Sequence, residues 1–557
     1  MHGFTLRLGG SNEMAKKIKL CAVVACVLLA LFAAASSPLT RASAAPTRAA
    51  QESKAEPARG LTPQERRGRA IYTRGESTSG REITALVGEL DVPSSTVTCA
   101  GCHGAHAEGK TEGGVTAGNL TWANLVKPYG HTHPTGRKHG PFDEAAFARA
   151  LADGVDPAGN TMLNAMPRFK MSPEDVADLI AYVKRIEDDR DPGISDAAVK
   201  VGTVLPLKGA LAELGASMRD VLNAFFDDVN GKGGIYNRRI ELQLAESGGD
   251  AAQTAEGARK LVREGQVFAL VGGLSAGADK ELASLAQEDE VPFIGPSTLM
   301  PQTGFGANRY IFYILPGMTE QARALVNFNS QRQTTAKSSV ALVYSEGEIG
   351  GAAATAVEEQ CKKVGCGELK RVSYAHSKFD APSLVRTLKG ANAVFFFGSA
   401  GDETAFIKEA DAASWRPDIF LLGALTGRDL VASVPAGFGG KVFLSFPTIP
   451  ADVTREGEGE LSALASKYKF PLRHAAAQLS ALAAAKLLAE GLERAGKDLS
   501  REKLITALEG LYDYETGLTP RITFGPNRRV GASGAYVVTI DAARKEFVLT
   551  GGWVKAD

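Results

Sequence analysis

The sequence predicts a multidomain protein in which a small all-α domain precedes a larger, two-lobed α/β domain. The pentapeptide Cys-Ala-Gly-Cys-His at residues 99–103 lies within short helical patterns that end near residue 187. A charged, turn-rich segment follows at residues 188–197. Beyond it, short β-branched or aromatic runs alternate with helical stretches. That alternation is typical of parallel sheets covered by helices, and a domain of this length would use two such sheets.

Length and composition are those of an ordinary globular protein. The chain has 557 residues, of which 44% are apolar and 23% are charged. This length corresponds to about three or four globular units of ordinary size. The formal net charge is zero, so nothing in the composition indicates binding to nucleic acid or to an anionic membrane surface.

Residues 1–45 form a predicted signal region for export. Lysines up to Lys19 precede an apolar run at residues 20–35, and Ala42-Ser43-Ala44 offers a cleavage site. The run is shorter than the roughly 20 residues that span a bilayer. We therefore expect a periplasmic protein, with an uncleaved membrane anchor as the alternative. Met14 is a second candidate start, and residues 46–60 form a predicted linker.

Residues 99–103 match the attachment signal of a c-type haem. Cys99 and Cys102 can each form a thioether bond with a haem vinyl group, and His103 can reach the iron as its proximal ligand. A redox-active cysteine pair is one alternative, but it does not need the trailing histidine. Half of a zinc site is another, but no second pair at zinc spacing is evident. The sequence therefore predicts one covalent haem c.

The other cysteines agree with export. Cys21 and Cys26 lie in the signal region, which leaves Cys361 and Cys366 in the larger domain. In an oxidising compartment these two can close a small disulfide. Two free thiols are the alternative.

Residues 61–187 form the predicted helical domain. A short helix is expected over residues 63–72, and Ser172-Pro173 starts the last helix with a polar cap and a first-turn proline. This arrangement resembles class I cytochrome c, in which the first and last helices cross through a small residue and aromatic side chains. The resemblance implies that this contact is made by Gly68, Tyr72 and Tyr182.

The same resemblance implies the second axial ligand of the iron. In that family a Met-Pro dipeptide before the last helix supplies it, and this position is Met166 here. Met162 and Met171 are neighbours that could substitute. A place in the apolar core is the alternative for Met166.

The sequence departs from the cytochrome pattern in two places. The loop at residues 117–120 lacks the proline that usually orients the proximal histidine. An insertion at residues 121–140 carries His131, His133 and His139. Three histidines on one loop could bind a metal or compete for the iron, although such residues are more often solvated or hydrogen-bonded.

Residues 198–557 form the predicted α/β domain. Its first lobe is expected at about residues 198–317 and 447–520, and its second at about residues 318–446 with the C-terminal part. A helix is predicted over residues 251–263. The predicted strands cover residues 199–205, 239–245, 267–271, 291–294, 340–344, 393–397 and 419–422.

Several stretches of this domain carry a family resemblance. They include Gly231-Lys232-Gly233-Gly234-Ile235, the Gly-rich segment at residues 271–277, and Val291-Pro292-Phe293-Ile294-Gly295-Pro296-Ser297-Thr298. Together they resemble the type I periplasmic solute-binding proteins, which include the branched-chain amino-acid binders. The resemblance implies a small-molecule site between two lobes, with first-lobe contacts from Ser275, Ser297 and Thr298. Local backbone capping is the alternative role for these hydroxyls.

The second lobe argues against a free amino acid as ligand. Amino-acid binders of this family place an aromatic side chain and an acid there to hold the ammonium group. The corresponding positions are occupied by Ile349, Ala400 and Leu425, although Glu346 and Glu348 lie close by. Because a buried ammonium without a carboxylate is costly, we expect a less charged or more apolar ligand.

Three functions are compatible with these features. The first is a periplasmic electron carrier linked to solute binding, which needs a redox partner protein. The second is a transport component that docks on a membrane permease and carries a redox-gating haem. The third, an enzyme oxidising its bound ligand through the haem, ranks last because the α/β domain shows no nucleophile–base set and no cofactor motif.

Overall fold

The computed structural model describes residues 61–557, except 105, 110, 113–114, 134, 303–307, 333–338, 428 and 557. The predicted signal region and the linker after it lie outside the described residues. The described residues all belong to one compact unit. Within the described part of the chain, no helix is both long enough and apolar enough for a membrane span.

The helical domain comes first along the chain. Its helices are α1 (Pro63–Arg74), α2 (Cys99–His103), α3 (Trp122–Leu125), α4 (Glu144–Asp153) and α5 (Pro173–Val183). Two of them begin as the sequence predicts. A capping box formed by Thr62 and Glu65 starts α1, and the Ser172 side chain accepts from the backbone N–H of Asp175 at the start of α5.

Helices α1 and α5 cross at Gly68, as the resemblance implied. A Cβ atom on Gly68 would lie 2.0 Å from the Asp178 carbonyl oxygen and 2.7 Å from the Tyr182 Cβ atom. The Tyr72 and Tyr182 rings pack beside this crossing, with centroids 5.7 Å apart. The predicted contact between the first and last helices is therefore confirmed.

Short antiparallel strands supplement the helices of this domain. They form one sheet in the order β2 (Leu90–Pro93), β1 (Thr84–Val87), β7 (Arg168–Lys170) and two small pairs. The pairs are β3 (Thr111–Glu112) with β4 (Val115–Thr116), and β5 (His131–Thr132) with β6 (Lys138–His139). The β5–β6 pair lies in the insertion at residues 121–140, and neither pair was predicted from the sequence.

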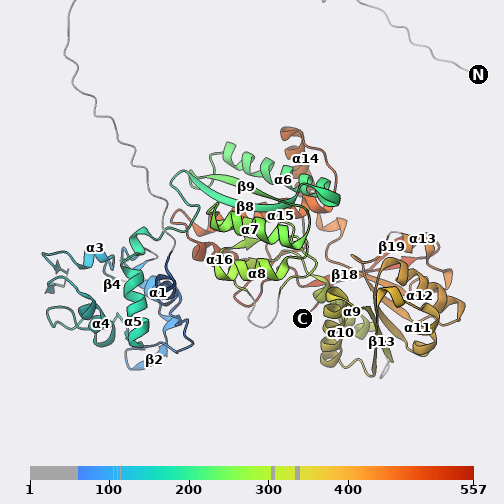
Figure 1. Cartoon of the computed structure of the whole chain (residues 1–557), viewed down its shortest axis with the longest axis horizontal. Helices are drawn as coiled ribbons and strands as arrows, with labels where there is room; N and C mark the ends of the chain where they lie inside the picture. The colour runs from blue at the N-terminus through green and yellow to red at the C-terminus, as the bar shows by residue number, and fades with distance from the viewer. Residues whose placement is uncertain are drawn as a thin grey trace, which may run out of the picture. The chain divides into compact units, whose positions relative to one another are not determined.

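The first sheet of the α/β domain is entirely parallel. Its order is β12 (Ile311–Phe312), β11 (Phe293–Ile294), β10 (Ala269–Val271), β8 (Ala198–Pro206) and β9 (Arg239–Ser247). Gly272 faces Leu222 of α6 (Ala212–Gly231) and Ala484 of α15 (Ala475–Ala495). On the other face, Gly202 lies against Leu261 of α7 (Ala251–Arg263), next to α8 (Asp279–Glu288) (Figure 1). Helices α14 (Arg455–Tyr468) and α16 (Arg501–Glu509) complete this core.

The second sheet has seven strands and its own two-sided core. Helices α9 (Met318–Arg332) and α10 (Glu348–Val364) cover one face, and α11 (Ala381–Leu388) and α12 (Ala400–Ala412) the other (Figure 1). A short helix, α13 (Asp429–Ser433), follows. The strand order is β14 (Leu369–Tyr374), β13 (Val340–Ser345), β15 (Ala393–Phe397), β16 (Asp418–Leu422), β17 (Val442–Phe446), β18 (Gly534–Asp541) and β19 (Glu546–Lys555).

The last two strands of this sheet are antiparallel to their neighbours. Strand β18 follows residues 447–533, which belong largely to the first core. The chain therefore passes into the second core, returns to the first, and ends in the second. This crossing brings distant helices to the first core and two distant strands, β18 and β19, to the second sheet.

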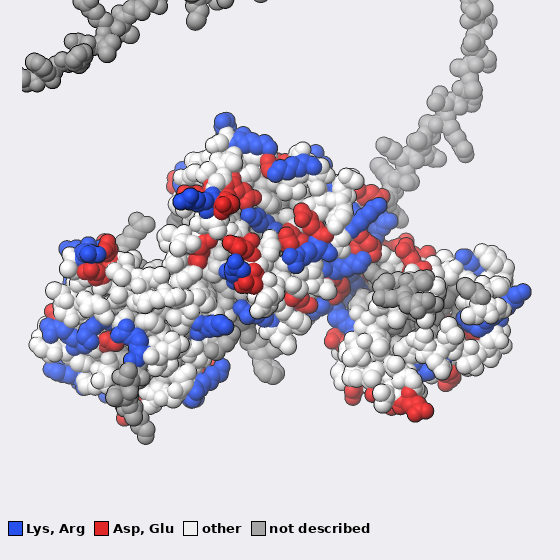
Figure 2. Space-filling model, turned by 180° about the vertical axis from the view of Figure 1, so that it is seen from behind, with Lys and Arg blue, Asp and Glu red and all other residues white. Residues whose placement is uncertain are grey.

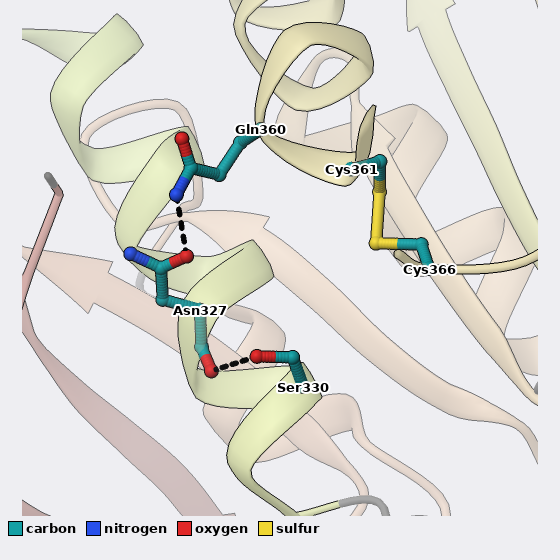
Figure 3. The surroundings of a disulfide bond; sticks show 5 residues. All are labelled: Asn327, Ser330, Gln360, Cys361 and Cys366. Carbon is teal, nitrogen blue, oxygen red and sulfur yellow. Dashed lines mark hydrogen bonds between the residues drawn. A yellow bond between two sulfur atoms is a disulfide. The ribbon is translucent and has the colours of Figure 1, made fainter. Parts of the chain in front are cut away.

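The structure joins Cys361 and Cys366 in a disulfide at the end of α10, with their Cα atoms 4.9 Å apart (Figure 3). Gly365 permits the turn because its φ of +75° is a left-handed conformation that glycine adopts without strain. Beside the disulfide, the Gln360 side-chain amide donates to the Asn327 side-chain oxygen at 2.6 Å and so ties α10 to α9.

Charged side chains of both signs lie on one face of the molecule (Figure 2). On the face shown in Figure 2, Lys and Arg side chains lie among Asp and Glu side chains. This pattern agrees with the zero net charge. We therefore expect no attraction of partners to this face by a field of a single sign.

Candidate functional site

Helix α2 carries the haem-attachment pentapeptide. Thr98 caps it, its side chain accepting from the Gly101 backbone N–H at 3.2 Å. Among the described cysteines, Cys99 and Cys102 are the free ones; Cys99 is buried and Cys102 is exposed. Burial raises the pKa of the Cys99 thiol to about 12. Two residues separate the cysteines on a one-turn helix, which is the spacing of the haem-attachment signal.

The protonation of His103 is fixed by its surroundings. Its Nδ1 atom lies 2.6 Å from the backbone carbonyl oxygen of Gly118, which can only accept a hydrogen bond. Nδ1 therefore carries the hydrogen, and Nε2 keeps a lone pair for a metal ion. Burial lowers the pKa of the ring, which favours this neutral form. The loop without proline thus orients the histidine through the Gly118 carbonyl.

Met166 packs against the core of the same domain. It is partly buried there, beside Met162 and Met171, and the core includes Cys99. The Arg168 guanidinium donates to the carbonyl oxygens of Met166 and Met162 and so ties the loop that carries both residues. The structure brings all three methionines to one core and leaves the choice of iron ligand among them as a prediction.

These residues fit a covalent haem. The fit rests on two free thiols, a neutral buried imidazole with a free nitrogen, and a thioether packed in the same domain. Haem c, when bound, supplies one-electron redox chemistry. The protein contributes the two attachment points, the orientation of His103 and the apolar surroundings.

The predicted solute-contact hydroxyls lie where strands β10 and β11 end. The Ser275 backbone N–H donates to the Ser297 carbonyl at 3.1 Å, so the two loops run side by side at the carboxyl ends of their strands. The Ser275 residue is buried. The Ser297 hydroxyl lies 3.0 Å from that of Ser480, and the Thr298 hydroxyl accepts from the Met300 N–H at 2.9 Å. The Ser297 hydroxyl thus has a partner that is distant in the sequence, whereas the Thr298 hydroxyl has a local backbone partner.

An acid accompanies these hydroxyls. Asp279, the first residue of α8, forms hydrogen bonds with Thr298 and Ser275. Burial nevertheless raises the pKa of its carboxyl group above the ordinary value, and these hydrogen bonds oppose the shift. A ligand carboxylate bound at the same hydroxyls would therefore meet a second acid, which disfavours it.

The lobe of the second sheet contributes apolar groups and buried acids, of which Glu403 is the least exposed. Ile349 and Leu425 pack partly buried against its core, and Ala400 starts α12. In the first turn of α12, Glu403 is 1% exposed. Burial raises its pKa to about 8, and Thr426 donates to one carboxyl oxygen at 2.8 Å. The other oxygen has no hydrogen-bond partner in the described structure. At neutral pH this carboxyl is largely uncharged.

A separate surface groove of about 660 Å³ lies between β9 and α7. It is open to solvent, and none of the predicted contact residues lines it. Its lining includes Leu244, Glu246, Gln253, Glu256, Lys260 and Glu264. The solute site is expected at the strand ends instead, because ligands of open α/β sheets bind outside the carboxyl ends of the strands.

Comparison with known families agrees with this geometry. The family model for periplasmic binding proteins matches residues 198–545, which is more than half of the chain. The chain belongs to the periplasmic binding protein family. A second family model, for cytochrome c, matches residues 94–187. The protein is thus a cytochrome c domain followed by a periplasmic binding protein domain of type I, and the cytochrome c family implies a covalently bound haem c.

Named relatives of this periplasmic binding protein are about one quarter identical to it. One is the Leu/Ile/Val-binding protein BraC3 of Rhizobium johnstonii, which is 24% identical over 60% of this chain and 89% of its own length. Another is the Leu/Ile/Val-binding protein homolog 3 of Brucella melitensis, at 23% identity over 58% of this chain and 86% of its own.

Solved structures show the same two-lobed fold. A putative branched-chain amino acid ABC transporter protein from Rhodospirillum rubrum has a TM-score of 0.52 and 18% identity, covering 63% of this chain and 99% of its own. A fatty acid ABC transporter substrate-binding protein from Thermomonospora curvata has a TM-score of 0.50 and 20% identity, covering 66% and 95%. At this identity the similarity establishes the fold of the binding protein domain.

Sequence reasoning missed three residues of these sites. Asp279 and Glu403 gain their importance from burial and from neighbours distant in the chain, and single-sequence patterns carry no signal for either. Gly118 orients His103 through its backbone carbonyl, a group that every residue type has. Its only sequence signal is its position in the loop after the CAGCH motif.

Proposed function

We propose that the protein is a periplasmic c-type cytochrome whose electron transfer is linked to the binding of a small solute. The observation that carries this proposal is the pairing, in one chain, of a haem-attachment helix with a neutral, preoriented His103 and a solute-binding fold. Both families also support a periplasmic location. A separate redox partner protein would exchange electrons with the cytochrome domain.

A redox titration by spectroscopy tests this proposal. The oxidised protein is mixed with candidate solutes under anaerobic conditions, and the haem absorption is followed. An electron carrier stays oxidised with solute alone and becomes reduced when a donor protein is added. Reduction by solute alone would instead establish an enzyme that oxidises its own ligand.

For the ligand, we propose a molecule with an uncharged polar head and an apolar body. Asp279 beside the first-lobe hydroxyls disfavours a carboxylate, and the apolar Ile349 and Leu425 together with the neutral Glu403 disfavour an ammonium. This proposal departs from the Leu/Ile/Val ligands named for the relatives. Mass spectrometry of small molecules that co-purify from native periplasm tests it, and recovery of leucine, isoleucine or valine would contradict it.

A transport role is the second candidate, because the similar solved structures include an ABC transporter substrate-binding protein. In that case the binding protein domain delivers solute to a membrane permease. Solute uptake by cells that carry Met166→Ala separates the two functions. Uptake independent of Met166 supports transport, whereas loss of uptake with an intact binding domain supports the redox link.

A further inference from the structure

The histidine insertion is a feature that the proposed function does not use. In the hairpin β5–β6, the His133 and His139 rings meet in an N–H···N hydrogen bond, with their Nε2 atoms 2.9 Å apart. The His139 ring also packs edge-on against Phe142 of the domain core, with ring centroids 5.1 Å apart. Arg137, just before β6, has its Nη2 atom 3.0 Å from the His133 Nε2 atom. The histidines thus anchor the hairpin to the core and hold the Arg137 guanidinium in place.

Arg137 connects this hairpin to the loop at residues 154–162. Its Nη1 atom donates to the Asp156 carboxylate at 2.6 Å. The Asp156 side chain is fully buried and that of Arg137 is 20% exposed, so solvent and salt screen this ion pair little. The Asn160 side-chain amide adds a second link, since it donates to the Lys138 carbonyl oxygen at 3.0 Å. The hairpin and the loop are therefore held together at two points.

The loop at residues 154–162 is built around the Asp156 carboxylate. One carboxylate oxygen accepts hydrogen bonds from two backbone N–H groups of the loop, each at 2.9 Å. At the base of the loop, the Met162 N–H donates to the Gly154 carbonyl oxygen at 2.8 Å. A displaced carboxylate would release the N–H groups inside the loop. The position of Met162, at the end of the loop, therefore depends on Asp156.

Arg168 holds the methionine segment, residues 162–166, from its other end. Its guanidinium donates to the carbonyl oxygen of Met162 at 3.1 Å and to that of Met166. The same guanidinium packs directly on Gly154, where a Cβ atom would lie 1.8 Å from the Arg168 Nε atom. The methionine segment is thus fixed between Arg168 and the loop that Asp156 organises.

We propose that the histidine hairpin braces the methionine segment of the haem site, and that Arg137 and Asp156 are the positioning residues through which it acts. This inference rests on the covalent haem and on a methionine of that segment as iron ligand. A ligand that is held in place leaves the iron less often, and the apparent affinity of a competing small ligand falls by the same factor. The insertion would thus protect the sixth position of the iron.

Cyanide binding to the ferric, full-length, haem-containing protein tests the brace. Potassium cyanide is titrated into the wild type, into Arg137→Ala and into the control Arg149→Ala, whose exposed arginine lies on α4 of the same domain. The visible spectrum reports binding. We expect Arg137→Ala to bind cyanide at least about tenfold more tightly than the other two, because a hydrogen bond between charged groups is lost.

Equal cyanide affinity in Arg137→Ala and the wild type would overturn the proposal. Met162→Ala and Met166→Ala are the references for an iron without its methionine. If both also match the wild type, methionine ligation fails together with the brace. No solute and no redox partner enter the measurement, so its outcome is independent of the proposed electron transfer.

A double-mutant cycle tests whether the two residues act through one contact. Asp156→Asn should also tighten cyanide binding, and Arg137→Ala combined with Asp156→Asn should bind no more tightly than the stronger single variant. Effects that multiply would contradict a shared contact. Arg137→Lys keeps the positive charge beside Asp156 and should restore most of the wild-type behaviour; an affinity as high as in Arg137→Ala would contradict the role of the ion pair. Haem content and circular dichroism establish that each variant is folded.

Discussion

Single backbone and side-chain groups set the chemistry of both candidate sites. The Gly118 carbonyl holds a hydrogen on one nitrogen of His103 and frees the other. Asp279 lies beside Ser275 and Thr298, two of the three residues that the family resemblance assigned to a ligand head, and burial raises the pKa of Glu403 to about 8. At this scale a substitution changes one interaction and leaves the fold intact. Three predictions follow this logic.

Met166→Ala should leave the haem attached and lower its reduction potential. Attachment uses Cys99 and Cys102, whereas a thioether ligand favours ferrous iron. The fall should exceed the ~59 mV that corresponds to a tenfold change in a one-electron equilibrium. Potentiometry with visible spectroscopy measures it. If both spectrum and potential match the wild type, Met166 is not a ligand, and Met162→Ala and Met171→Ala become the variants to measure.

Asp279→Asn should strengthen the binding of ligands with a carboxylate, such as leucine, by several-fold. The substitution removes a titratable acid from the hydroxyls of Ser275 and Thr298 while keeping a side chain that can hydrogen-bond. Isothermal titration calorimetry measures the affinity. Glu281→Gln, on the exposed side of the same helix, is the matched control. If Asp279→Asn and the wild type bind leucine with equal affinity, Asp279 does not determine which ligand binds.

Glu403 should make the stability of the second lobe depend on pH. Its pKa is about 8 in the folded protein and near 4.5 when exposed. The neutral Glu403 carboxyl therefore makes its full contribution to the free energy of unfolding below about pH 4.5. This contribution is lost as the pH rises through 8, by up to ~1.4 kcal/mol per pH unit. Urea denaturation between pH 5 and pH 8 measures the slope. Glu403→Gln should flatten it, Glu409→Gln should not, and an unchanged slope in Glu403→Gln would refute the assignment.

At the scale of elements, local sequence patterns predict the helices and strands whose own residues show a clear periodicity or capping motif. Helix α7 and strand β15 have the bounds predicted from apolar periodicity and from a β-branched and aromatic run. The capped start of α5 is likewise encoded by Ser172 and Pro173. Strands β1 and β2 were missed because four-residue strands at a surface lack regular alternation of burial. Strands β17 and β18 were not predicted, and their antiparallel pairing joins segments that are far apart in the chain.

The same distinction holds for the candidate sites. Cys99, Cys102 and His103 are contiguous, so residue identity and spacing predict their joint chemistry. Asp279 and Glu403 matter through long-range burial, which one sequence does not reveal.

Gly68→Ala should destabilise the crossing of α1 and α5. The added methyl group would lie 2.0 Å from the Asp178 carbonyl oxygen, so the helices must separate. Overpacking of this kind costs about 1–3 kcal/mol. Thermal denaturation followed at the haem absorption measures the loss. Gly140→Ala, where the methyl group meets open space, is the control. Equal midpoints for the two variants would contradict a close crossing at Gly68.

At the scale of the whole molecule, the chain joins domains of two families, and each domain has hydrophobic cores of its own. The binding protein domain is built from two sheets with separate cores, and the chain passes between the two cores. The cytochrome domain has its own core, centred on the crossing of α1 and α5. The proposal of electron transfer linked to solute binding rests on the presence of both domains in one chain.

The intact mass and visible spectrum of the exported protein, produced in a host that ligates haem, test the central claim most directly. We expect a coloured protein whose mass exceeds that of the mature polypeptide by one haem, and impaired attachment in Cys102→Ala. A colourless wild-type protein at the mass of the bare polypeptide would contradict the account.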